Sequence, residues 1–227
     1  MNIGILGTGI VGQTISGKLA EIGHEVVVGT RDVGKTMART GPGPYGLPSF
    51  SDWQKQHPGI KLGTFADSAR HGEVVINATN GEASLDALTL AGASNLNGKI
   101  LIDISNPLDF SKGMPPTLSL CNTDSSGEVI QHAFPEAKVV KTLNTLTASL
   151  MVNPRQLADG EHTIFVSGND AEAKAQVVSW LTSWFGWRHI IDLGDITTAR
   201  GTEMYLPIWL RLMGALGTGM FNIQVVK

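Results

Sequence analysis

The chain has 227 residues, of which 42% are hydrophobic and 16% charged, and its formal net charge is −3. Such a composition fits one sizeable globular domain and excludes a disordered chain, and the small negative charge gives no reason to expect a nucleic-acid partner. The single cysteine, Cys121, excludes an internal disulfide framework and a zinc site built from several thiolates. The six histidines show no metal-ligand spacing, so no metal site is expected.

Residues 3–6 form an apolar run that predicts the first strand of a parallel sheet, and G-x-G-x-x-G follows directly. In a dinucleotide site Gly7 permits a tight turn, Gly9 lets a pyrophosphate approach bare backbone, and Gly12 lets the next helix pack closely. The helix N-terminus adds unpaired N–H groups and a partial positive charge. The expected pyrophosphate site also includes Thr8, Ile10 and Val11. A glycine turn that serves packing alone is the alternative, but the strand, turn and helix follow in the order that dinucleotide binding requires.

The helix after this turn is predicted from Val11, Ile15, Leu19 and Ile22, which recur at helical spacing before a stop at Gly23. A helix of about three turns is therefore expected between the first strand and the second.

The second predicted strand, residues 25–29, leads into Thr30-Arg31-Asp32, where a Rossmann-type site reads the adenosine ribose. A hydroxyl beside a guanidinium suits a 2′-phosphate, because arginine makes charge-assisted and often bidentate bonds to phosphate. Lys35 adds positive charge one turn further on. The pattern therefore favours NADP over NAD. Two alternatives remain open: Arg31 is a solvated surface cation, and Asp32 either holds a ribose hydroxyl or caps the next helix.

The rest of the chain alternates predicted strands with predicted helices. The strands are expected at 60–65, 73–77, 99–104, 138–141, 162–167 and 187–193, and the helices at 51–57, 66–71, 82–91, 128–134, up to 151, 170–185 and 195–204. This order predicts an α/β protein with a Rossmann-type, doubly wound and mostly parallel sheet. Residues 1–194 are expected to form the NADP-binding domain, and 195–227 a short C-terminal helical extension that is not an independent domain.

Two segments predict loops. Residues 41–48 read Gly-Pro-Gly-Pro-Tyr-Gly-Leu-Pro, which excludes regular structure; the loop either covers the adenosine end of the cofactor or serves only as a connector. Residues 109–127 are rich in Pro, Ser, Thr and Gly and are expected to form a long irregular loop. A loop of that length in a compact domain is usually functional, so it is a candidate lid over the nicotinamide end.

Polar residues follow two of the expected strands, with Ala78, Thr79 and Asn80 after one and Asn106 and Pro107 after another. Ligands of open α/β sheets lie beyond the carboxyl ends of the strands. These residues are therefore expected to contact the ribose, phosphate or nicotinamide of the cofactor. For Asn106-Pro107 an ordinary turn is the alternative.

Residues 205–223 are largely apolar but carry Pro207 near the start and Arg211 near the centre. A central arginine is costly in lipid, so a buried or subunit-interface helix is expected, and no membrane span. A homodimer through this helix and a helix packed on its own sheet both fit the sequence. The first strand follows Met1 without a basic flank, so no secretory signal is expected and the predicted location is cytoplasmic.

A family resemblance emerges from the motifs taken together. The order G-T-G-x-V-G, G-T-R-D, K-I-L-I-D-I-S-N-P, K-V-V-K-T-L-N-T and V-S-G-N-D resembles the F420-dependent NADP oxidoreductases, and it is similar to the NADPH-binding oxidoreductase domain of the STEAP metalloreductases. The similarity runs from Met1 to about Leu206. It implies NADP(H) in the cleft, with Thr30 and Arg31 on the 2′-phosphate and Asn106-Pro107 near the nicotinamide.

The resemblance further implies a pocket for a hydride acceptor, which Asn144 would face. Leu108, Thr145 and Met204 are the other residues expected there. The expected activity is hydride transfer between NADP(H) and a small-molecule acceptor of deazaflavin or flavin type, such as coenzyme F420. Such transfer mainly requires two stacked rings with the reacting carbons about 3–3.5 Å apart, which fits a sequence in which no catalytic residue is identified. An NADP-dependent reductase of a small carbonyl or imine compound and a non-catalytic NADP(H)-sensing module remain as alternatives.

Overall fold

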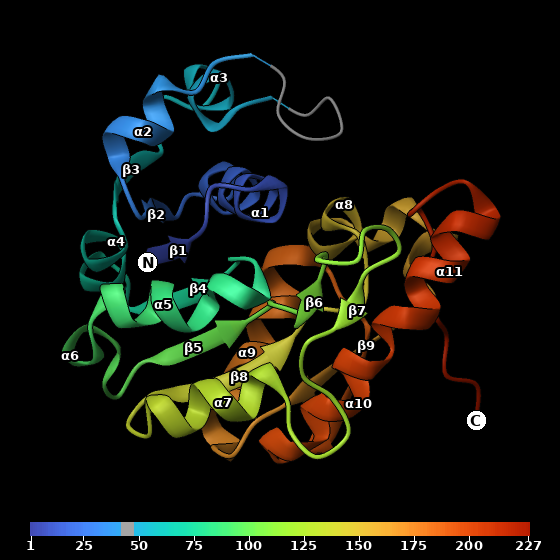
Figure 1. Ribbon diagram of the computed structural model, residues 1–227. Coiled ribbons are helices and arrows are strands. Elements are labelled where there is room, and N and C mark those ends of the chain that lie inside the picture. Colours follow the sequence, from blue (N-terminus) through green and yellow to red (C-terminus); the bar gives the residue numbers. More distant parts are fainter. Residues whose placement is uncertain (42–47) are drawn as a thin grey trace.

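The computed structural model describes residues 1–41 and 48–227, so residues 42–47 of the expected loop at 41–48 lie outside the described residues. Within the described residues, one large sheet carries helices on both faces, and a small hairpin of two strands lies beyond the carboxyl end of its central strand β5 (Ile100–Asp103) (Figure 1). No helix in this part of the chain combines the length and the apolar character that crossing a bilayer requires.

The large sheet has the strand order β10-β9-β8-β5-β4-β1-β2-β3. Its strands are β1 (Asn2–Leu6), β2 (Glu25–Thr30), β3 (Lys61–Thr64), β4 (Val74–Asn77), β5 (Ile100–Asp103), β8 (Lys138–Thr142), β9 (Thr163–Ser167) and β10 (His189–Gly194). All neighbouring pairs are parallel except β8 and β9. The chain builds outward from β1 on one side and from β4 on the other, which confirms the predicted Rossmann-type, mostly parallel sheet.

The helices cover the sheet in two layers. They are α1 (Ile10–Glu21), α2 (Val33–Ala38), α3 (Phe50–Lys55), α4 (Phe65–His71), α5 (Gly81–Ala91), α6 (Ala93–Leu96), α7 (Ser126–Ala133), α8 (Ala148–Val152), α9 (Ala171–Trp180), α10 (Ala199–Met204) and α11 (Leu206–Leu216). Alternate strand residues face opposite layers. Ile5 and Ile76 join one apolar core with α1, α8 and α9, whereas Leu6, Val75 and Leu101 join the other with α4, α5 and α7.

The expected irregular loop at 109–127 is partly ordered. It starts within a short antiparallel hairpin of β6 (Leu108–Asp109) and β7 (Thr117–Leu118). The loop also ends earlier than expected, because Ser125 caps α7 by accepting a hydrogen bond from the backbone N–H of Glu128 (3.1 Å). Serine is a favoured capping residue, so the predicted helix start at 128 was two residues late.

The C-terminal segment also departs from the prediction. The expected apolar helix over 205–223 ends at Leu216, because Gly217 adopts a left-handed backbone (φ 67°) that terminates it. The tail beyond returns to the sheet, where Thr163 at the start of β9 donates its backbone N–H to the carbonyl of Ile223 (2.9 Å). Similarly, α9 ends at Trp180 and is followed by a π-helical turn over Leu181–Phe185 instead of continuing to 185.

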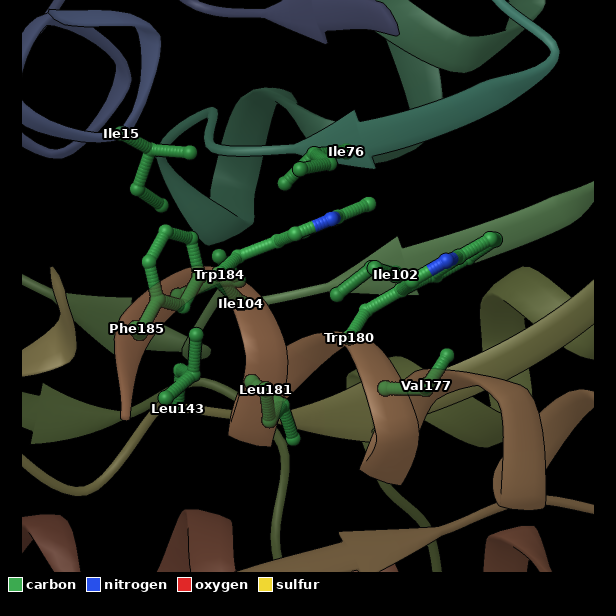
Figure 2. A pocket seen from close by; sticks show the side chains of 10 residues that line it. All are labelled: Ile15, Ile76, Ile102, Ile104, Leu143, Val177, Trp180, Leu181, Trp184 and Phe185. Carbon is green, nitrogen blue, oxygen red and sulfur yellow. The ribbon is translucent and has the colours of Figure 1, made fainter. Parts of the chain in front are cut away.

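A small void remains in the core between α1, the sheet and the turn after α9 (Figure 2). Its volume is ≈ 10 Å³, and its wall consists of Ile15, Ile76, Ile102, Ile104, Leu143, Val177, Trp180, Leu181, Trp184 and Phe185. Trp180 and Trp184 stack with their ring centroids 4.8 Å apart. A void of this size with an apolar lining stays dry, so it is a packing defect and not a ligand site.

Two carboxylates fasten α10 to the beginning of α7. Arg200 donates to Glu128 from both Nε (2.8 Å) and Nη2 (2.5 Å). Glu203 accepts hydrogen bonds from the backbone N–H groups of Ser126 (2.8 Å) and Gly127 (3.1 Å). The segment after residue 195 is therefore anchored to the body of the sheet by polar contacts as well as by apolar ones.

The Glu128–Arg200 pair makes this attachment sensitive to acid. The hydrogen bond from Arg200 holds the pKa of Glu128 below its usual value. A carboxylate of this kind contributes its full stabilisation above its unfolded pKa of about 4.3, and the contribution is lost as the pH falls from about that value through the lower pKa of the folded state. After correction for intrinsic rates, hydrogen exchange in α7 and α10 should therefore accelerate as the pH falls from about 5 to about 3. Glu128→Gln should abolish this dependence; equal acid sensitivity in the variant would contradict the assignment.

Candidate functional site

The turn after β1 contains two glycines that the fold itself requires. Gly7 has φ +116°, and a Cβ there would lie 2.6 Å from the carbonyl oxygen of Ala78. A Cβ on Gly12 would collide with the carbonyl oxygen of Gly7. Gly9 is different, because a Cβ there would meet no protein atom within 4 Å. The fold does not explain this third glycine, whereas a pyrophosphate approaching the open backbone would.

The N-terminus of α1 is suited to an anion. Gly9 supplies no side-chain cap, and the first turn of this 12-residue helix contains no acidic residue. Gln13 is buried and donates from Nε2 to the carbonyl oxygen of Thr8 (3.0 Å), which fixes the turn. Ile10 is exposed and Val11 half-buried, so their backbone lies near the surface. The unpaired N–H groups and the helix dipole therefore face the space above Gly9.

Arg31 directly follows β2 and provides a positive charge at the same end of the sheet as the glycine turn. Arg31 is exposed, and among residues 1–41 and 48–227 no carboxylate lies within 4 Å of its guanidinium. Asp32 caps α2 by accepting from the backbone N–H of Lys35 (2.9 Å), and this bond holds the pKa of Asp32 below its usual value. Thr30 points inward instead, with its hydroxyl 2.8 Å from that of Thr36. A contact of Thr30 or Lys35 with a 2′-phosphate remains a prediction.

The tips of β4 and β5 are locked together. The buried Asn77 donates from Nδ2 to Asp103 Oδ1 (2.8 Å) and accepts from the hydroxyl of Thr79 (2.6 Å). A Cβ on Gly81, the first residue of α5, would collide with the carbonyl oxygen of Asn106. The polar residues predicted after these two strands therefore lie next to one another, beyond the ends of β4 and β5. One of them, Asn80, caps α5 by accepting a hydrogen bond from the backbone N–H of Glu82 (3.3 Å).

The tips of β5 and β8 are joined by a reciprocal amide pair. Asn106 donates from Nδ2 to the carbonyl of Asn144 (2.8 Å), and Asn144 donates from Nδ2 to Asn106 Oδ1 (2.9 Å). The structure thus brings together two residues predicted separately. Of the other residues expected near the acceptor, Thr145 is buried, Leu108 is half-buried in β6, and Met204 is exposed at the end of α10.

A buried ionic cluster below this edge was missed by the sequence analysis. Lys141 is 1% exposed, and its Nζ lies 2.8 Å from Asp103 Oδ2 and 2.7 Å from Glu203 Oε1. Burial disfavours the ammonium, but the charges of the two carboxylates outweigh it, so the pKa of Lys141 is raised above its usual value. The available signal was an aspartate and a lysine inside otherwise apolar strand sequences.

These features meet at the carboxyl edge of the sheet where the strand order reverses, which is where a dinucleotide lies in proteins with this architecture. By its fold and its site, the chain is a Rossmann-type dinucleotide-binding protein.

Comparison with known proteins identifies the family. Residues 2–107 match the family described as NADP oxidoreductase coenzyme F420-dependent. The crystal structure of a putative F420-dependent NADP-reductase from Arthrobacter sp. FB24 is 59% identical over the whole of both chains, with a TM-score of 0.95. The F420-dependent NADP reductase of Methanothermobacter marburgensis is 26% identical over 93% of this chain and 92% of its own length. The chain belongs to this family of NADP oxidoreductases, which confirms the resemblance predicted from the sequence.

Two further comparisons reach proteins with other names. Rat metalloreductase STEAP3 is 30% identical over 96% of this chain, which spans only 40% of that protein's length. An imine reductase from Myxococcus stipitatus superimposes with a TM-score of 0.61 at 13% identity, over 95% of this chain and 63% of its own, and shows a common fold alone.

The two kinds of glycine in the turn after β1 allow a direct test. Gly9→Ala should leave thermal stability nearly unchanged but weaken NADPH binding by roughly tenfold or more, because the methyl group occupies the space of the pyrophosphate. Gly12→Ala should instead destabilise the fold by about 1–3 kcal/mol through the collision with Gly7. Calorimetric titration and thermal denaturation separate the two effects; unimpaired binding by Gly9→Ala would contradict the site.

Proposed function

We propose that this protein transfers hydride between NADP(H) and a deazaflavin or flavin-type acceptor such as coenzyme F420. The observation that carries the proposal is the Asn106–Asn144 amide pair, which stands at the same edge as the open backbone of Gly9. Carboxamide groups supply both donors and acceptors, which match the carboxamide of a nicotinamide. The family to which the chain belongs, and the names of its relatives, support both NADP(H) and F420.

In this proposal each part of the edge holds one part of NADP(H). The pyrophosphate lies on Gly7, Thr8, Gly9, Ile10, Val11 and Gly12. The 2′-phosphate lies against Arg31, with Thr30 and Lys35 beside it. The nicotinamide half lies along Ala78, Thr79, Asn80, Asn106 and Pro107. The acceptor is expected against Leu108, Asn144, Thr145 and Met204.

The chemistry itself belongs to the cofactor, since NADPH supplies the hydride when it is bound. The chain's contribution is orientation. Asn106 and Asn144 restrain each other, so their remaining polar atoms point in fixed directions. Because Gly81 has no side chain, the backbone of Asn106 can approach the start of α5 closely. Groups fixed in this way lower the entropic cost of aligning two rings for transfer.

The domain assignment and assembly are further proposals. Residues 1–194 form the NADP-binding domain. Residues 195–227 are an extension that does not form a separate domain, since the buried Glu203 contacts Lys141 in β8 and Ser126 in α7. Exposed apolar side chains on α11, including Ile208 (55%) and Leu216 (57%), support a homodimer through that helix. A cytoplasmic location is proposed from the activity of the family.

Acceptor specificity tests the function. Rapid mixing of the NADPH-loaded protein with F420, FMN, ferric chelates and panels of carbonyl and imine compounds should show fast oxidation with the deazaflavin or flavin. Turnover restricted to carbonyl or imine compounds would identify the alternative reductase. Tight NADPH binding with no oxidation by any acceptor would instead indicate a sensing module.

Arg31 tests the choice of nucleotide. Arg31→Ala should weaken NADPH binding by about 1.5–3 kcal/mol through the loss of a charged hydrogen bond, and should leave NADH binding nearly unchanged. Arg70→Ala is the control, because Arg70 pairs with Asp67 at the end of α4 and lies outside the proposed site. Equal losses for both nucleotides would show that Arg31 does not read the 2′-phosphate.

A further inference from the structure

We propose that Lys141 and Glu203 are positioning residues, which hold the tip of β5 in the geometry that receives the nicotinamide and tie that geometry to the seating of the C-terminal helices. This inference rests on the function proposed above.

The ammonium group of Lys141 contacts three oxygen atoms. It donates hydrogen bonds to Asp103 Oδ2 (2.8 Å) and to the carbonyl oxygen of Ser105 (2.5 Å), and it forms an ion pair with Glu203 Oε1 (2.7 Å). Two of the three oxygens belong to Asp103, the last residue of β5, and to Ser105, which directly precedes Asn106. The direction in which Asn106 leaves the sheet is therefore set from β8.

The same turn is held a second time by Asp103. Its Oδ1 accepts from the backbone N–H (3.2 Å) and the hydroxyl (2.8 Å) of Ser105, and from Nδ2 of Asn77 in β4 (2.8 Å). Three residues beyond Lys141, Asn144 then bonds to Asn106 itself. The segment from Lys141 to Asn144 therefore contacts the end of β5 at two points. Lys141 makes its contact within the sheet, and Asn144 makes its contact just after the end of β8.

Glu203 links Lys141 to the C-terminal segment, because it lies in α10. Its Oε1 lies 2.7 Å from Lys141 Nζ and accepts from the backbone N–H of Gly127, and its Oε2 accepts from that of Ser126, so the carboxylate lies at the N-terminus of α7. The helix dipole stabilises a negative charge there. Displacement of α10 would remove one of the two carboxylates that pair with the buried ammonium of Lys141.

Stability alone does not account for such a cluster. Desolvation offsets most of the attraction within a buried ion pair, and well-packed apolar residues often replace one without loss. The cluster holds one cation between two carboxylates, all of them buried. Unlike apolar packing, the polar contacts of this cluster fix the orientation of the groups that they join.

A purely structural role for Glu203 is the competing explanation, and the chain contains a matched control. The Glu128–Arg200 pair also joins α7 to α10, but Glu128 makes no contact with Lys141. Glu128→Gln removes the carboxylate that pairs with Arg200 but leaves Glu203 on Lys141 and on the N-terminus of α7, so α10 should stay seated and the tip of β5 unchanged. Glu203→Gln should affect both, because its amide would place a donor against either Lys141 or the backbone N–H groups.

The experiment compares two ligands that share the adenosine half, NADPH and 2′,5′-ADP. Wild type and Glu128→Gln should bind both alike. Glu203→Gln should bind 2′,5′-ADP normally but NADPH about fivefold to tenfold more weakly, with reduced fluorescence anisotropy of the bound nicotinamide. The double variant Lys141→Met with Glu203→Leu removes one charge of each sign and, by apolar packing, should stay folded while showing the same selective loss.

Equal losses for both ligands, or normal NADPH binding and anisotropy in folded Glu203→Gln and in the double variant, would overturn the inference. A loss of the same size in Glu128→Gln would also overturn it, because docking alone would then explain the effect. These readouts need no hydride acceptor, so failure of the wild type to reduce F420 or flavin would refute the proposed function separately.

Discussion

The site depends on three places where backbone approaches backbone more closely than a side chain would allow. Gly12 lies against the carbonyl of Gly7, Gly7 lies against that of Ala78, and Gly81 lies against that of Asn106. Together they bring the tips of β1, β4 and β5 into one row. A dinucleotide is a long ligand whose two halves must be held at a fixed separation, and this row provides a continuous backbone surface along which it can lie.

Beneath that row, polar side chains replace the apolar packing found elsewhere in the sheet. Asn77, Asp103 and Lys141 come from three adjacent strands, and each is buried and hydrogen-bonded to a neighbour in the group. A fully satisfied network of this kind favours one arrangement over others, even where it adds little stability. The apolar layers determine where the strands lie, and the polar network determines how their ends are oriented.

Local features were predicted well from the sequence because their signals are local. The glycine turn, its helix and the polar strand tips at Asn106 and Asn144 follow from short motifs, and their joint order indicated the family. Contacts between distant residues could not be predicted in this way. Neither the pairing of Asn106 with Asn144 nor the meeting of Lys141 with Glu203 leaves a periodic trace, since partners 38 or 62 positions apart are placed by the fold. The end of α11 at Gly217 was missed because the apolar composition continues beyond it.

Transfer of an isotopic label tests the central claim most directly. NADPH carrying two deuterium atoms at the hydride-donating carbon would be mixed with oxidised F420 and the protein in ordinary water, and the reduced deazaflavin examined by mass spectrometry. The account predicts that the deuterium passes directly to the deazaflavin ring at the rate of NADPH oxidation. Reduced F420 without the label, or no reduction of F420 at all, would contradict direct hydride transfer between two rings held at this edge of the sheet.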